Sequence, residues 1–177
     1  MAAKRAMAQT NEPASRLLAW DGVSFKVPAN WELALYTFEK KGPVHIEVED
    51  EYAVRIEGQW LRAHEPFKTR DALKRYEKNI YGTTRLADHK EVVQGLPKGW
   101  MATIYRFREG VLTKDIPSPM QENQGLVTAF YESDDRKFFC YLLMHFTPED
   151  PENPPEIVRM LTNSLTVHNT TIIPWAL

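Results

Sequence analysis

The chain has 177 residues, of which 43% are hydrophobic and 26% are charged, and its formal net charge is -2. These values are typical of a single globular domain, and they argue against wholesale disorder and against a fibrous architecture. A charge so close to neutral also argues against non-specific nucleic-acid binding, which needs a positive field.

The first 16 residues are polar, contain a proline and show no sustained periodicity, so we expect a flexible leader over 1–16. One domain is expected to follow over 17–170. No apolar stretch has the length of a signal peptide or of a membrane-spanning helix, which predicts a protein that neither is secreted nor crosses a membrane. Short strands are predicted near 17–20, 22–27 and 31–38.

Residues 45–60, "HIEVEDEYAVRIEGQW", alternate between acidic or polar and aliphatic side chains. Period two over this length predicts a β-hairpin. A three-residue loop at 50–52 would pair Glu47 with Arg55 and keep the two faces distinct. We therefore expect the carboxylates to face water on one side of the hairpin, with Glu47 and Arg55 as an exposed ion pair.

A helix is predicted over 67–82, with Thr69 as its cap and Gly82 as its end. Its cations are explained by the helix dipole, although a phosphate-binding role is the alternative. Strands at 91–94 and 100–108 should follow, and then an irregular stretch over 113–125.

That irregular stretch, "TKDIPSPMQENQG", is the best sequence candidate for a binding loop, because exposed loops often carry function. A plain surface loop is the alternative. The candidate binding residues are Ile116, Pro117, Pro119 and Met120.

A second hairpin, turning at 133–136, has two apolar faces and should lie centrally in a sheet. A helix should then begin after Asn153, with Pro154 at its first position. This order predicts an α+β fold, an α/β/α sandwich whose largely antiparallel sheet is covered by a helix on each face. Residues 171–177, "IIPWAL" and the threonine before it, are expected to form an edge strand or to begin a further domain.

The five histidines lack the spacing of zinc sites, and the single cysteine, Cys140, lies in the apolar run "FFCYLLM". Glu47 and Glu49 could chelate a metal-bound triphosphate, but the lysine expected beside such a pair is missing. The tryptophans are expected in the core. The sequence therefore predicts no catalytic residue, no metal site and no cofactor.

Two stretches, "WDGVSFKVPANWEL" with its Pro28–Trp31 turn and "PPEIVRMLTNSLTV" near the end, resemble the PsbP-like superfamily. The resemblance implies a helix packed on an antiparallel sheet, and a fold used mainly for adaptor or accessory roles. It implies no functional residue.

These observations predict a non-catalytic, cytoplasmic domain that binds a protein partner or itself and serves a scaffolding or accessory role. The alternative is a small-ligand binder or weak hydrolase with a pocket between sheet and helix. Neither a nucleic acid nor a membrane is expected as a partner.

Overall fold

The structure describes residues 14–37, 43–66, 68–85, 87–107, 125–146 and 153–168 of the chain. In this computed structural model, those residues form ten strands and two helices. In chain order the elements are β1 (Ser15–Trp20), β2 (Val23–Pro28), β3 (Glu32–Thr37), β4 (Val44–Glu49), β5 (Val54–Arg62), α1 (Thr69–Thr84), β6 (His89–Val92), β7 (Trp100–Arg106), β8 (Gly125–Glu132), β9 (Phe138–Phe146), α2 (Pro154–Ser164) and β10 (Thr166–Val167).

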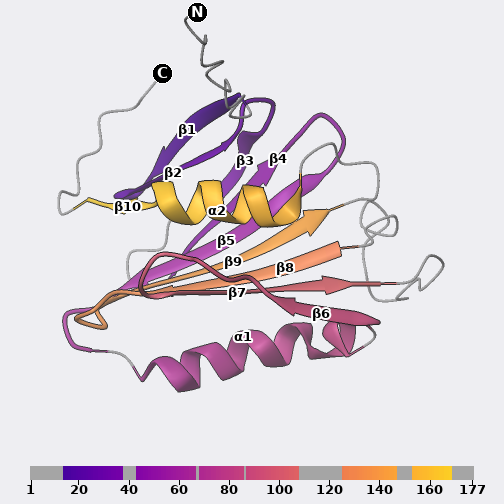
Figure 1. Ribbon diagram of the computed structural model, residues 1–177. Coiled ribbons are helices and arrows are strands. Elements are labelled where there is room, and N and C mark those ends of the chain that lie inside the picture. The colour runs from indigo at the N-terminus through magenta and orange to yellow at the C-terminus, as the bar shows by residue number, and fades with distance from the viewer. Residues whose placement is uncertain are drawn as a thin grey trace, which may run out of the picture.

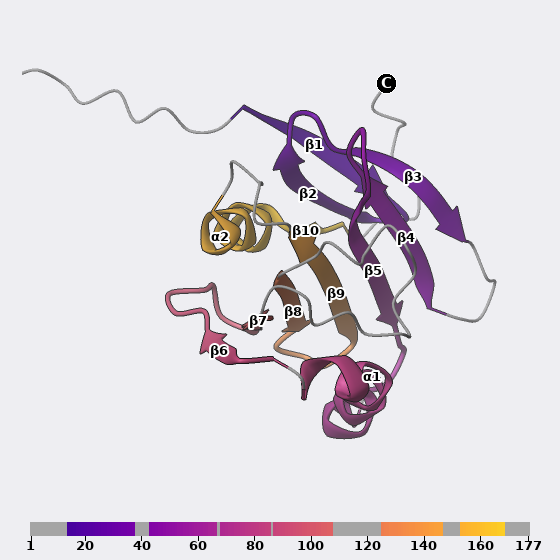
Figure 2. The same cartoon turned by 90° about the vertical axis from the view of Figure 1, so that its right-hand side faces the viewer.

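Seven of the strands form one antiparallel sheet in the order β3-β4-β5-β9-β8-β7-β6. Strands β1, β2 and β10 form a second antiparallel sheet. Figure 1 shows α1 below the large sheet and α2 above it. Figure 2 shows β2 and β10 on the same side of the large sheet as α2. Among the described elements, one face of the large sheet therefore carries the short helix α1, and the other carries the short helix α2 together with a second sheet.

The predicted α/β/α sandwich with a helix covering each face is wrong. The protein is mainly β-structure in two antiparallel sheets, and its helices have only 16 and 11 residues. Strands β1 and β2 of the second sheet were predicted, but its third strand has no local signal, because β10 contains only Thr166 and Val167 and pairs with Ser24 and Val23 of β2, far away in the chain. Pairing over such a sequence distance cannot be inferred from hydrophobic periodicity, which reports only on neighbouring residues.

The core lies between the large sheet and the layer formed by α2 and the small sheet. Leu142 of β9 and Leu161 of α2 are fully buried there, and burial of a leucine side chain contributes about 1.5–3 kcal/mol. Trp31, Trp60 and Trp100 are also buried, which confirms the core position predicted for them.

Strand β9 is buried on both faces, as the sequence predicted for a central strand. Eight of its nine residues are buried. Cys140 belongs to the core beneath α2, and burial raises the pKa of its thiol. Phe139 and Tyr141 lie on the opposite face, in a separate cluster beneath α1. The buried, inert cysteine is thus confirmed.

The hairpin of β4 and β5 forms, but its predicted register is wrong. Glu47 pairs with Glu57, not with Arg55, and Val48 pairs with Ile56. A register shift after Val48 pairs Glu49 with Val54, so Arg55 is the extra residue of a bulge. Such a bulge bends the strand and redirects the extra side chain.

Asp50 explains the register of this hairpin, because its side chain closes a loop longer than expected. Its Oδ1 accepts hydrogen bonds from the backbone N–H groups of Tyr52 and Ala53, at 2.8 and 2.9 Å. Its Oδ2 accepts from Arg55 Nε at 2.6 Å, and the Asp50 and Arg55 side chains are only 5% and 8% exposed. Burial raises the pKa of Asp50, but these hydrogen bonds outweigh it and hold the pKa below its ordinary value. The expected exposed ion pair is therefore replaced by a buried one.

Both helices form, with differences at their ends. Helix α1 includes Thr69 and continues past Gly82 to Thr84. Asn153 is the N-cap of α2 and Pro154 follows it, as predicted, although the cap makes no side-chain hydrogen bond. Its backbone carbonyl instead accepts from the N–H of Ile157 at 3.2 Å.

Several sequence-based expectations fall outside the described residues. They concern most of the leader, up to residue 13, nearly all of the loop over 113–125, and the segment 171–177. Strand β1 begins at Ser15, so two residues assigned to the leader belong to a strand.

A pair of glycine substitutions tests the packing of β5 between its two neighbours. A Cβ atom at Gly58 would lie 2.8 Å from Ile46 Cγ1 and 3.0 Å from Leu142 Cδ2. We expect Gly58→Ala to lower the free energy of unfolding by about 1–3 kcal/mol because of this overpacking. In the control, Gly82→Ala on α1, the new methyl group meets nothing within 4 Å, and a gain of about 0.5–1 kcal/mol is expected. Urea denaturation measures both, and equal stability of the two variants would contradict this packing.

Candidate functional site

Helix α1 is held on the sheet by an aromatic cluster. The Tyr76 ring stacks on Tyr141 with 4.5 Å between centroids and on Phe139 with 5.5 Å. Phe130 of β8 packs against Phe139 at 4.7 Å, and Leu73 of α1 joins the cluster. Stacked rings add to the energy of burial, so these contacts fix where α1 crosses β9 and β8.

A chain of hydrogen bonds ties the same helix to the neighbouring strands. The Tyr76 hydroxyl donates to Gln59 Oε1 at 2.7 Å, and Gln59 Nε2 lies 3.2 Å from His45 Nδ1. An amide nitrogen can only donate, so His45 Nδ1 is the acceptor and the ring proton is on Nε2. That nitrogen lies 3.5 Å from Glu47 Oε1. The polar face of β4 and β5 therefore anchors α1, and Glu47 is half-buried in this network.

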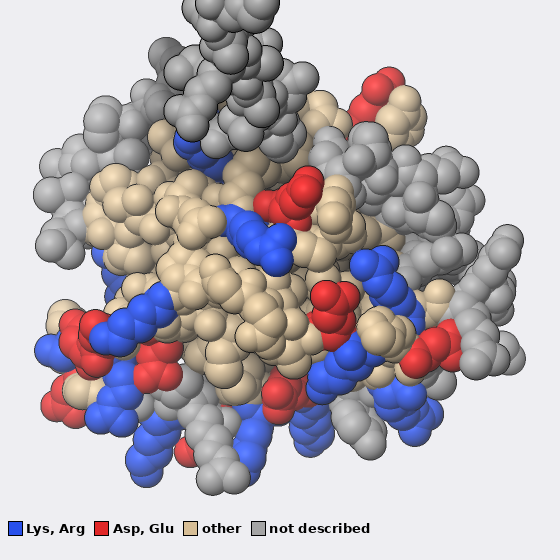
Figure 3. Space-filling model, in the orientation of Figure 1, with Lys and Arg blue, Asp and Glu red and all other residues tan. Residues whose placement is uncertain are grey.

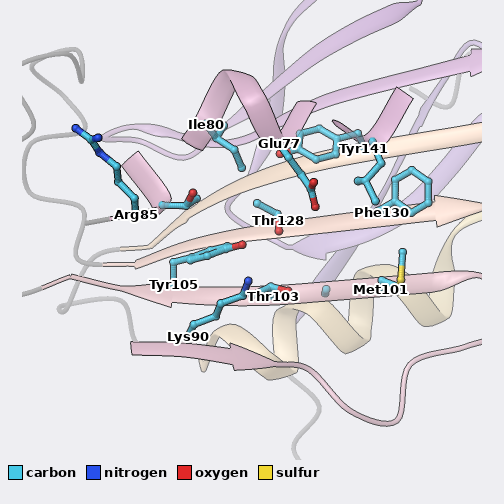
Figure 4. A pocket seen from close by; sticks show the side chains of 13 residues that line it. Glu77, Ile80, Arg85, Lys90, Met101, Thr103, Tyr105, Thr128, Phe130 and Tyr141 are labelled. Carbon is cyan, nitrogen blue, oxygen red and sulfur yellow. The ribbon is translucent and has the colours of Figure 1, made fainter. Parts of the chain in front are cut away.

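A groove of about 520 Å³ opens between α1 and strands β6 to β9 (Figure 4). Small-molecule sites typically enclose about 300–1,000 Å³ and combine apolar walls with a few polar groups. The groove is lined by Leu73, Glu77, Ile80, Thr84, Arg85, Lys90, Met101, Ala102, Thr103, Tyr105, Thr128, Phe130 and Tyr141.

The two ends of this groove differ in polarity. Lys90 and Tyr105 lie at the end near the C-terminus of α1, and Lys90 Nζ is 5.4 Å from the centroid of the Tyr105 ring. Met101 and Phe130 lie toward the other end, and Glu77 hangs from α1 between the two ends (Figure 4). A ligand lying along the groove would meet a cation first, then a carboxylate, and then an apolar region.

Helix α1, which forms one wall of the groove, is also basic on its outer side. Segment 68–85 has six lysine or arginine residues and two acidic residues, and hence a formal charge of +4, whereas the whole chain carries -2. Figure 3 shows the lysine and arginine side chains along the lower side of the molecule, where α1 lies. Lys74, Arg75 and Lys78 are exposed there. The positive field is therefore local to this helix and its surroundings.

Tyr141 lines the groove, but its hydroxyl is buried behind the groove wall. The residue is 6% exposed, and its hydroxyl has no hydrogen-bond partner among the described residues. Burial is the largest cause that raises its pKa, so the hydroxyl stays protonated and remains a donor. A buried hydroxyl without a partner costs about 1–3 kcal/mol.

A second pair of titratable groups lies on the same face of the sheet but does not line the groove. His145 is buried, and its Nε2 lies 2.9 Å from Glu57 Oε1. The hydrogen bond from His145 is the main reason why the pKa of Glu57 is lowered. Cys140 belongs to the cluster on the opposite face of β9, so this histidine and the cysteine do not meet.

The loop residues chosen from the sequence, Ile116, Pro117, Pro119 and Met120, lie outside the described residues. The sequence offered a pocket between sheet and helix as the alternative, but it assigned no binding role to the residues that line this groove, although the alternation Met101-Thr103-Tyr105 in β7 placed three of them on one face. The sequence does not show where α1 lies, and the position of α1 decides which part of that face it leaves uncovered.

Across the described ranges, no three histidine, cysteine, aspartate or glutamate side chains are grouped to hold a metal ion. None of the helices in that part of the chain is long and apolar enough to cross a membrane. Neither a protein-family model nor a curated protein matches the sequence. The interpretation of function therefore begins from the groove.

Two tyrosine substitutions distinguish the unpartnered hydroxyl from a bonded one. Tyr141→Phe removes a hydroxyl without a partner, so we expect the free energy of unfolding to stay the same or to rise by up to about 3 kcal/mol. Tyr76→Phe removes the donor to Gln59 and should cost about 0.5–1.5 kcal/mol. Urea denaturation of the ligand-free protein measures both changes. An equal loss in the two variants would mean that the Tyr141 hydroxyl is already satisfied.

Proposed function

We propose that this chain is a non-catalytic binding domain whose small-molecule ligand occupies the groove between α1 and the large sheet. The observation that carries the proposal is the groove itself, which has the size of small-molecule sites and combines apolar walls with a few polar groups.

The composition of the groove supports binding rather than catalysis. Its charged residues are Glu77 on α1, Arg85 just after α1, and Lys90 on β6, and Glu77 lies apart from the other two along the groove (Figure 4). Catalysis needs reactive groups within about 3 Å of one reacting atom. The thiol of Cys140 lies in the core on the other face of the sheet.

The proposal is tested by blocking the groove. Thr128 lies on the groove floor in β8, and Thr128→Trp would fill the space above it. The control is Thr37→Trp on β3, which places the same side chain at an exposed position on another strand. The probe is Nile red, a neutral dye whose fluorescence rises in apolar surroundings.

We expect the wild type and Thr37→Trp to bind Nile red with the same affinity, and Thr128→Trp to bind it at least about ten-fold more weakly, a change of 1.4 kcal/mol. Native mass spectrometry of the purified wild type should also detect a bound small molecule that Thr128→Trp lacks. Identical dye binding by all three proteins would contradict the proposal.

The exposed edge strand β3 favours a second candidate function, self-association as part of a scaffolding role. Five of its six residues are exposed, and Leu35 and Tyr36 are 45% and 50% exposed. A register shift between Leu33 and Leu35 interrupts its ladder, so contact through side chains is favoured over an extended strand pairing. The PsbP-like resemblance of the sequence, which implies accessory roles, agrees with this candidate. A cytoplasmic location is part of the proposal and is supported by the single, buried cysteine.

Self-association through β3 predicts that charge on this strand produces a monomer. We expect Leu35→Asp to abolish a concentration-dependent dimer, because a carboxylate on an apolar contact is costly to desolvate. Leu17→Asp on β1, where Leu17 is 55% exposed, is the matched control and should leave the dimer intact. Sedimentation velocity over a range of concentrations measures this. A wild type that is monomeric throughout would rule the candidate out.

A further inference from the structure

We propose that the ligand of the groove is a free, single-headed amphipathic anion, an alkyl or aryl monocarboxylate. Its carboxylate would lie at Lys90, and its apolar body would extend toward Met101 and Phe130. This inference rests on the proposed function, because it names the chemical class of ligand for the same groove.

Lys90 supplies the site for the negative group. Its side chain is exposed at the groove mouth, and Figure 4 shows its amine directed toward Tyr105. No ion pair of Lys90 or of Arg85 is found within the described part of the chain. Lysine ammonium groups are point charges with three donors, and an unpaired one beside a groove is free to bind a carboxylate.

The surroundings of Lys90 keep this end positive. Arg85 follows the last turn of α1, with its guanidinium directed outward from the groove (Figure 4). The C-terminus of α1 contributes about half of one negative charge. Two full positive charges outweigh it, so the end of the groove near Lys90 attracts anions.

The other end of the groove suits an apolar body. Met101 is 55% exposed although it lies beside the aromatic cluster, and Phe130 is buried in the floor. Leu73 of α1, which is one turn N-terminal to Glu77, also lines the groove. An alkyl or aryl group laid here would cover the exposed methionine, and removal of apolar surface from water is favourable.

Glu77 limits the ligand to one negative group. Its exposed carboxylate projects into the middle of the groove, between Lys90 and the apolar end (Figure 4). A second anionic group farther along the ligand would be repelled there, since like charges at about 4 Å oppose each other even near a protein surface. The arrangement therefore favours a monocarboxylate over dicarboxylates and over polyanions such as nucleic acids.

The experiment compares four probes that share a ten-carbon chain but differ in their ends, below the concentrations at which they form micelles. Decanoate, decanol, decyltrimethylammonium and decanedioate compete with Nile red for the 177-residue protein. We expect decanoate to bind most tightly. Its affinity should be about ten-fold higher than that of decyltrimethylammonium, because one charge-assisted hydrogen bond contributes about that much. Its advantage should shrink as salt rises.

Lys90→Gln should abolish the preference for decanoate over decanol, and Lys90→Glu should reverse the preference between the anion and the cation. The control is Lys98→Gln, because Lys98 is also exposed but pairs with Asp134 at 2.8 Å, away from the groove. That variant should keep the wild-type order. Thermal melting checks that every variant is folded, and the four probes on the wild type decide the order without any substitution.

The results separate this inference from the proposed function. In one outcome, Nile red binds and Thr128→Trp blocks it, but decanoate and decyltrimethylammonium bind equally well. The inference about the anion then fails, while the proposed binding groove remains supported. Binding to vesicles that contain anionic phospholipid, without binding of free decanoate, would also overturn it. If Nile red does not bind in the groove at all, the proposed function fails first.

Discussion

Strand β9 must be covered on both faces, and the rest of the molecule is arranged around that requirement. One face carries Cys140, Leu142 and Met144 into the core beneath α2, and the other carries Phe139 and Tyr141 toward α1. Exposure of either row to water would forfeit about 25 cal/mol for each Å² of apolar surface. The strand therefore lies inside the sheet, between β5 and β8, and each of its faces recruits a covering layer.

The two covering layers differ in width, and this difference produces the groove. An α-helix with its side chains is about 10 Å wide, and neighbouring strands are about 4.8 Å apart, so one helix covers about two strands. Above the sheet, α2 is widened by β1, β2 and β10. Below it, α1 is the one described element over β9 and its neighbours, and on the adjacent face of β6 and β7 Val92 and Met101 are each 55% exposed within the described part of the chain.

The position of α1 also explains why the acidic hairpin and the groove serve different roles. On one side of the helix, Gln59 accepts from the Tyr76 hydroxyl and is itself bonded to His45, and this chain holds the helix in place. On its other side, Lys90 and Glu77 line open space and keep their charges available. The carboxylates of residues 45–60, which stand out most in the sequence, thus have structural roles. By contrast, Lys90 on the short edge strand β6 gives its end of the groove a positive charge.

The sequence by itself determined the elements whose signals are local. Alternation over 45–60 gave the β4–β5 hairpin, the doubly apolar run gave β9 as a central strand, and Asn153-Pro154 marked the start of α2. These signals are local because backbone geometry fixes the side-chain period of a strand or a helix.

Only the tertiary structure decided what depends on distant partners. The register around Arg55 follows from the loop that the Asp50 side chain closes, which alternation does not report. The second sheet follows from contacts such as Ser24 with His168, at 2.8 Å between Oγ and Nε2. The groove exists because α1 packs on the aromatic cluster and is narrower than the sheet. Both facts depend on packing between elements, and no local sequence pattern contains that information.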